Sequence, residues 1–156
     1  MIETPAREDV QAIIGIVERA GGFGRMDVDC VKELLEDYFR LADHGGYHWL
    51  VYRQEGRVLG MACYGPAPLT EGTFDLYWLA TDPQAQRTGI GRALIETMES
   101  DVRQKGGRLI VVETSGTEGY APARAFYLSR GYHRQATIPD FYAPGDDLVF
   151  YVKRLH

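Results

Sequence analysis

The chain is poor in cysteine and has no long apolar run. Its two cysteines, Cys30 and Cys63, form no CxxC pair, which argues against a thiol-bound metal site or a disulfide framework. Each lies in a stretch of apolar periodicity, so we expect two buried free thiols. No apolar run approaches the roughly 18 residues of a membrane-spanning helix. The N-terminal segment MIETPARED lacks the apolar core of a signal peptide, and we therefore expect a cytoplasmic protein that does not engage a membrane.

Basic residues are also scarce. Lysine and arginine total 17 against 22 aspartates and glutamates, which gives a net charge of −5. Proteins that bind nucleic-acid phosphates are usually basic, so this charge argues against a nucleic-acid partner. It favours a cationic or neutral small partner instead. The four histidines show no metal-ligand spacing, and we expect no metal site.

The length of 156 residues predicts one domain, 1–156, with a full hydrophobic core. Apolar residues at helical spacing predict helices over about 7–20, 27–41, 89–105 and 121–129. Glycines in 21–25 are expected to end the first helix. Runs of β-branched and aromatic residues predict strands over about 2–3, 47–53, 57–65, 73–81, 108–114, 132–138 and 147–154.

The middle of the chain reads as a strand–helix–strand unit. The helix 89–105 lies between two apolar strands, 73–81 and 108–114, and this order is typical of two parallel strands joined by a crossover. The strands on either side are joined by shorter connections. The sequence therefore predicts an α/β (α+β) protein with a single mixed, mostly antiparallel sheet, a central parallel βαβ unit and helices on both faces.

Two glycines, Gly89 and Gly91, stand at the start of the third predicted helix. Glycine lets a ligand approach the backbone closely, and the unpaired N–H groups and dipole of a helix start favour an anion. A P-loop would require Lys-Ser or Lys-Thr after these glycines, and a dinucleotide fingerprint would require glycine or alanine where Leu94 stands. The loop is therefore expected to hold a phosphate in some other way.

Two segments together resemble a known family. LATDPQAQRTGIGRAL, which contains the glycine loop, and APARAFYLSRGY (121–132) are similar to the two signatures of the GNAT superfamily, the N-acetyltransferases that use acetyl-CoA. The second signature is carried by Ala123, Phe126, Tyr127, Gly131 and Tyr132. The resemblance is strongest over 74–132, and the order of predicted elements is also that of the superfamily. It implies the GNAT fold and acetyl transfer from acetyl-CoA to an amine.

The resemblance implies that coenzyme A contacts a strand end, the glycine loop and the last helix. The residues carried over are Leu79, Ala80, Thr81, Gln86, Arg87, Thr88, Gly89, Ile90, Gly91, Arg92, Ala123, Phe126 and Tyr127. Arg87 and Arg92 are expected to add charge-assisted bonds to phosphate, the 3′-phosphate included. Many relatives have asparagine where this chain has Tyr120, so no cofactor contact is carried over to that position.

The resemblance also makes Tyr127 the general acid that protonates the departing thiolate. The base that accepts the proton of the amine is left open between two carboxylates and water. Asp75 lies six residues before Thr81, where several relatives carry a glutamate, and Glu113 interrupts an otherwise apolar strand. Simple alternation along strand 73–81 predicts that Asp75, Tyr77, Leu79 and Thr81 share one face.

In the superfamily the acceptor site lies between the N-terminal helix linker, here 21–27, and the loop between the last two strands, here 138–147. Phe23, Tyr77, Asp140 and Tyr142 are the expected wall, with Asp146 in the same loop. Acidic and aromatic groups suit a cationic amine, although APGDD is equally a good turn sequence.

We expect a small-molecule primary amine as the acceptor. Two alternatives stay open. One is a protein acetyltransferase acting on lysine or an N-terminal amine, which would need an open groove. The other, of a different class, is a non-catalytic acyl-CoA-binding or sensory domain. The resemblance also allows a homodimer.

Overall fold

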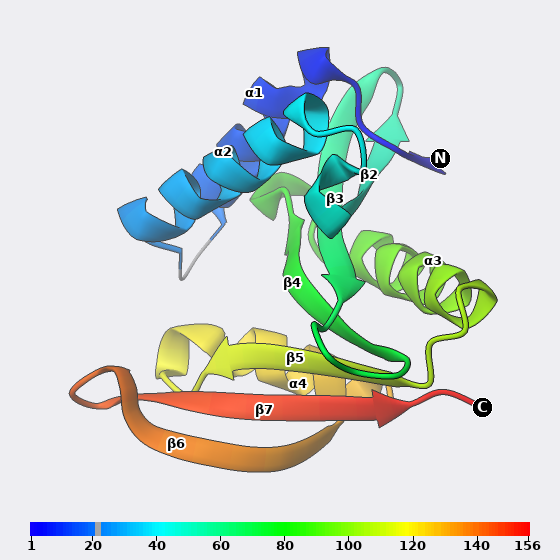
Figure 1. Cartoon of the computed structure of the whole chain (residues 1–156). Helices are drawn as coiled ribbons and strands as arrows, with labels where there is room; N and C mark the ends of the chain where they lie inside the picture. Colours follow the sequence, from blue (N-terminus) through cyan, green and yellow to red (C-terminus); the bar gives the residue numbers. More distant parts are fainter. Residues whose placement is uncertain (21–22) are drawn as a thin grey trace.

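The structure is a computed structural model that describes residues 1–20 and 23–156 (Figure 1). The predicted glycine break over 21–25 thus falls partly outside the described residues. The helices are α1 (Val10–Arg19), α2 (Arg25–Arg40), α3 (Ile90–Gln104) and α4 (Ala121–Ser129). The strands are β1 (Ile2–Glu3), β2 (His48–Gln54), β3 (Arg57–Pro66), β4 (Thr73–Thr81), β5 (Leu109–Ser115), β6 (His133–Ala143) and β7 (Asp146–Arg154).

The strands form one seven-stranded sheet in the order β1-β2-β3-β4-β5-β7-β6. Only β4 and β5 pair in parallel, and every other neighbouring pair is antiparallel. The helix α3 connects the two parallel strands. The predicted mixed sheet with a central βαβ unit is therefore confirmed.

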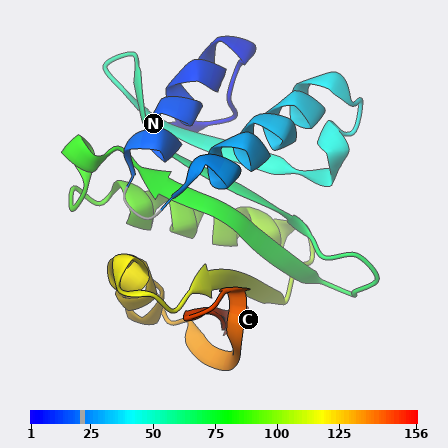
Figure 2. The same cartoon turned by 90° about the vertical axis from the view of Figure 1, so that its left-hand side faces the viewer.

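Helices cover both faces of the sheet (Figures 1 and 2). The amphipathic helices α1 and α2 bury their apolar sides against β2, β3 and the end of β4. On the other face, α3 and α4 pack against β3, β4, β5 and β7. Two separate cores result, and each lies where apolar helix stripes meet one face of the sheet.

The strands β4 and β5 pair over only part of their length. Their register runs from Thr73 opposite Leu109 to Leu76 opposite Val112, and no further pair follows among the described residues. Beyond this point the two strands part, and Figure 2 shows β4 (green) and β5 (yellow) diverging. The C-terminal half of β4 therefore has an edge that β5 does not cover.

A β-bulge in β4 corrects the predicted alternation. Cys63 of β3 pairs with Trp78, and the next residue of β3 pairs with Leu76, so Tyr77 is the extra residue of the bulge. Leu76 and Leu79 consequently both join the core beside α3, whereas Tyr77 contacts Tyr47 on the opposite side. The prediction that Asp75, Tyr77, Leu79 and Thr81 share one face was wrong, because the bulge reverses the alternation between them.

Three further expectations need correction. The first helix begins at Val10, because residues Arg7–Asp9 form a 3₁₀ turn. The strand β6 continues to Ala143, so most of the predicted loop 138–147 is a bulged ribbon paired with β7. Cys30 is exposed because it lies on the outer side of α2; Cys63 is buried, and both thiols are free. Among the described residues, no helix is long and apolar enough to cross a membrane.

Candidate active site

The first part of the site is the loop between β4 and α3. It is anchored by Asp82, whose carboxylate accepts hydrogen bonds from the backbone N–H of Gln84 at 3.0 Å and from the Arg19 guanidinium at 2.8 Å. The Asp82 side chain is almost fully buried, and the hydrogen bond from Gln84 is the main reason why its pKa is lowered. Asp82 is buried whereas the Arg19 side chain is more than half exposed, and their ion pair ties the end of α1 to the entrance of the loop.

The loop then presents its backbone to solvent. Arg87 has φ 63° and Gly89 φ 87°, and a Cβ added at Gly89 would meet no atom within 4 Å. Within the described residues, no acceptor takes the backbone N–H groups of Gly89 to Arg92. Four free donors at a helix start, beside an open glycine, fit a diphosphate. The backbone of this loop therefore fits the diphosphate of coenzyme A, as expected from the sequence.

Glycines also set how closely this loop lies to its neighbours. A Cβ at Gly60 of β3 would lie 2.7 Å from Cγ2 of Ile90, so a side chain there would push α3 away. A Cβ at Gly91 would lie 3.6 Å from the Phe126 ring and 3.7 Å from Oγ1 of Thr81. The loop, the end of β4 and the first turns of α4 therefore meet at one place, as the three predicted coenzyme A segments require.

Of the two predicted phosphate-binding arginines, Arg92 bonds to Glu96 on its own helix, with Nε to Oε1 at 2.8 Å. Both side chains are more than half exposed, so this pair is weak and can be exchanged for a phosphate. Arg87 makes no ion pair within the described part of the chain.

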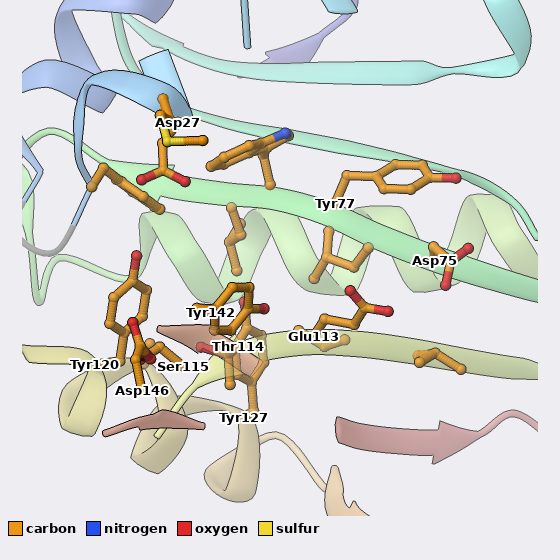
Figure 3. Close-up of a pocket in the computed structure, with 18 residues that line it drawn as sticks. Asp27, Asp75, Tyr77, Glu113, Thr114, Ser115, Tyr120, Tyr127, Tyr142 and Asp146 are labelled. Atoms are coloured by element: carbon orange, nitrogen blue, oxygen red, sulfur yellow. Dashed lines mark hydrogen bonds between the residues drawn. The ribbon is translucent and has the colours of Figure 1, made fainter. Parts of the chain in front are cut away.

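The second part of the site is a cavity of about 560 Å³ where β4 and β5 part (Figure 3). Four of its lining residues are carboxylic acids, Asp27, Asp75, Glu113 and Asp146, and none of the described lining residues is lysine, arginine or histidine. The other lining residues are apolar, aromatic or hydroxyl-bearing: Phe23, Met26, Leu76, Tyr77, Trp78, Leu79, Val111, Val112, Thr114, Ser115, Tyr120, Ala123, Tyr127 and Tyr142. The wall is therefore acidic and aromatic.

The two candidate bases lie on neighbouring strands. Asp75 is paired with Val111, two residues before Glu113, and the two acids point toward the same side of the sheet in Figure 3. Burial raises the pKa of Asp75, with a smaller opposite effect from the hydroxyl of Tyr77. Burial also raises the pKa of Glu113, and the charge of Asp75 raises it further. Both carboxylates are thus stronger bases than in water.

Tyr127 comes from α4 and is 7% exposed. Its ring packs between those of Phe126, Tyr132 and Tyr151, with centroids 5.6 to 6.1 Å apart. The hydroxyl makes no hydrogen bond to any described residue, although the side chain lines the cavity. Burial raises its pKa well above the usual value for tyrosine, so the hydroxyl stays protonated and is able to donate.

The predicted acceptor residues are not all brought together. Phe23, Tyr77 and Tyr142 line the cavity, but Asp140 lies outside its wall and accepts a hydrogen bond from the Gly145 backbone at 2.7 Å. Asp140 thus stabilises the β6–β7 turn. This is the alternative to an acceptor role that the turn sequence APGDD allowed. Ala80, predicted to bind coenzyme A through its backbone, turns its methyl group into the core beside α1 and α2.

Asp27 and Trp78 also line the cavity, and sequence reasoning did not single them out. Asp27 reads as an ordinary helix-start residue, and its carboxylate does accept from the Gly24 backbone at 2.7 Å. Trp78 faces the cavity because of the bulge at Tyr77. No local signal in the sequence would have revealed either placement.

Comparison with known proteins agrees with this arrangement. The model of the acetyltransferase (GNAT) family matches residues 19–132. The solved structure of a GNAT-family protein from Desulfovibrio desulfuricans is 38% identical, with a TM-score of 0.95 and coverage of 99% of this chain and 98% of that one.

Two relatives are similar in sequence. An uncharacterized N-acetyltransferase of Methanocaldococcus jannaschii is 26% identical over 143 residues, which cover 85% of this chain and 88% of that protein. The ribosomal protein bS18-alanine N-acetyltransferase of Escherichia coli K12 is 32% identical over 108 residues, 68% of this chain and 69% of that protein. Together with the phosphate loop and the parted strands, these matches show that the chain belongs to the GNAT family of acetyltransferases.

Proposed function

We propose that the protein transfers the acetyl group of acetyl-CoA to a cationic primary amine of a small molecule. The observation that carries the proposal is the cavity between β4 and β5, which has four carboxylates and no basic residue among its described lining residues. Such a wall attracts a protonated amine by charge, and its aromatic rings add cation–π attraction.

The chain's own backbone supplies the donor's binding site in this proposal. The free N–H groups of Gly89 to Arg92 hold the diphosphate, and the uncovered edge of β4 from Leu79 to Thr81 bonds the pantetheine arm. Bound in this way, acetyl-CoA supplies an activated thioester. Tyr127 lines the cavity into which the thioester would have to extend.

The reaction forms a C–N bond and breaks the C–S bond of the thioester. The ammonium nitrogen loses one proton before it attacks, and Glu113 accepts this proton, directly or through a water, with Asp75 as the rival base. The sulfur departs as a thiolate and takes a proton from the Tyr127 hydroxyl. The second proton, which the nitrogen loses as the amide forms, restores that hydroxyl. Burial favours both roles, because it raises the basicity of the carboxylates and keeps the tyrosine protonated.

A thiol-release assay with acetyl-CoA tests the proposal. The panel holds small primary amines, a peptide with an N-terminal alanine and a lysine-containing peptide with a blocked N-terminus. We expect release with small cationic amines at a kcat/KM at least tenfold above that of either peptide. Coenzyme A binding without release for any acceptor would overturn the proposal in favour of a binding domain.

A second candidate function rests on one relative. The E. coli protein that is 32% identical acts, by its name, on the alanine of ribosomal protein bS18. An N-terminal amine is also a cationic primary amine, so the acidic cavity does not exclude it. Preferential release with the alanine peptide would favour this candidate over a small molecule.

A further inference from the structure

The carboxylates of the cavity form two groups. Asp75 and Glu113 belong to β4 and β5, whereas Asp27 and Asp146 belong to the first turn of α2 and the first residue of β7. In Figure 3 the two groups lie on opposite sides of Tyr127. One amine nitrogen at the reacting position can meet only one of these groups. The second group has no use in the chemistry proposed above.

Asp27 and Asp146 each keep an oxygen available. Oδ2 of Asp27 accepts from the Gly24 backbone, and Oδ1 of Asp146 accepts from the hydroxyl of Ser115. Neither remaining oxygen has a hydrogen-bond partner among the described residues, and neither acid forms an ion pair there. Two negative charges thus face one end of a cavity whose described lining includes no basic side chain.

Aromatic rings surround the same end. The Phe23 ring contacts Trp78 at 5.5 Å and Tyr120 at 6.1 Å, in both cases edge to face. Tyr120 lines the cavity together with Asp27 and Asp146, and burial, then the charges of these acids, raise the pKa of Tyr120 to about 12. Rings beside carboxylates are the surroundings that bind alkylammonium groups.

A separate observation points to a ligand in this cavity. Tyr127 is more than nine-tenths buried, lines the cavity, and has no hydrogen-bond partner for its hydroxyl among the described residues. A hydroxyl that opens onto the cavity without a protein partner is available to a ligand there.

We propose that the acceptor carries a second cationic nitrogen, as in an alkyl diamine or polyamine. This inference rests on the proposed function. The nitrogen to be acetylated lies beside Glu113 and Tyr127, and the second lies between Asp27, Asp146 and the three rings. Ser115, which bonds Asp146, is two residues beyond Glu113 on β5, or about 7 Å, so a chain of about four or five carbons joins the two positions.

Steady-state kinetics with 1,4-diaminobutane and n-butylamine test the inference, because the two differ only in the second amine. In the wild-type protein we expect kcat/KM to favour the diamine by about thirtyfold. Asp146→Asn and Asp27→Asn keep oxygens for Ser115 and Gly24 but remove the charge, and each should lower the diamine-to-monoamine ratio about tenfold. Glu118→Gln is the matched control, because Glu118 is exposed beside Tyr120 and does not line the cavity; the ratio should not change.

Equal kcat/KM for the two amines in the wild type would overturn the second cation site and leave the proposed function intact. A ratio that both asparagine variants leave unchanged would also overturn it. Calorimetric titration of each amine into the coenzyme A-loaded protein measures binding without turnover, and it therefore distinguishes the second cation site from the proposed function. If no amine is acetylated, the proposed function fails, while diamine binding that Asp146→Asn abolishes would still support the site. Diamine and monoamine binding of equal strength would contradict it.

Discussion

The two sides of the gap between β4 and β5 are built by different means. On the proposed coenzyme A side, the candidate binding groups are backbone N–H donors of one continuous segment, Gly89 to Arg92. On the acceptor side, they are side chains from α2, β4, β5 and β7, more than a hundred residues apart in the chain. The first side is set by local conformation and the second by tertiary packing. Substitutions should therefore separate the two sides, with Tyr127 at their boundary.

The largest effect is expected from Tyr127→Phe. Removing the acid should lower kcat about 100-fold, within the usual range for general acid catalysis, while the KM for acetyl-CoA stays nearly constant. The melting temperature should change little, because the lost hydroxyl has no hydrogen-bond partner among the described residues. Steady-state assays measure kcat and the KM for acetyl-CoA, and thermal unfolding measures the melting temperature.

The neighbouring Tyr132 gives the matched control. Its hydroxyl donates to the buried carboxylate of Glu99 at 2.9 Å, so Tyr132→Phe should destabilise the fold by about 1–3 kcal/mol. Its kcat should remain within about twofold of wild type, because it does not line the cavity. Unchanged turnover in Tyr127→Phe would eliminate the acid assignment.

Glu113→Gln is expected to have the next largest effect, about thirtyfold on kcat. As a base, Glu113 must be ionised, so activity is present above its pKa and is lost as the pH falls through it. Burial and the charge of Asp75 raise this pKa, which places the acid limb of the pH–kcat/KM profile above the usual glutamate range. The limb should be absent in Glu113→Gln.

Asp75→Asn distinguishes the two carboxylates. Removing the negative charge of Asp75 lowers the pKa of Glu113, so the acid limb should move to lower pH while kcat falls only a few-fold. Should Asp75→Asn abolish the limb and Glu113→Gln merely shift it, the base is Asp75. A pH profile of each variant over the acid range makes the measurement.

The contrast between the two sides also explains what could be predicted from the sequence. The helix 121–129 and the strand 73–81 have their predicted bounds, because turn residues and apolar periodicity mark their ends. The loop of Gly89 and Gly91 was identifiable because its spacing is local. Its role toward coenzyme A remains a prediction that the free N–H groups support.

The acceptor side was less accessible to sequence reasoning. Nothing in TFDLYWLAT marks Tyr77 as the extra residue of a bulge, yet that residue decides which neighbours face the cavity. Asp27 reads as a helix cap and becomes part of the wall only when α2 packs beside β4. Asp140 and Asp146 belong to the same acidic turn sequence. The pairing of β6 with β7 places Asp146 in the cavity wall and Asp140 outside it, and the sequence does not show this pairing.

Of the four variants, Gly89→Ala is expected to have the smallest effect on kcat, because it acts on the binding of acetyl-CoA. A side chain at φ 87° strains the backbone by about 1 kcal/mol or slightly more, and relief of that strain turns the N–H groups of the loop away from the diphosphate. The KM for acetyl-CoA should rise about fivefold, with the KM for the amine unchanged. Gly56 has φ 77° and equally open surroundings in the β2–β3 turn, and it does not line the cavity, so Gly56→Ala should destabilise the fold similarly without changing either KM. If the KM for acetyl-CoA is the same in Gly89→Ala and Gly56→Ala, the prediction is wrong. The Gly89 loop would then tolerate the strain, and Gly89 would serve only to begin α3.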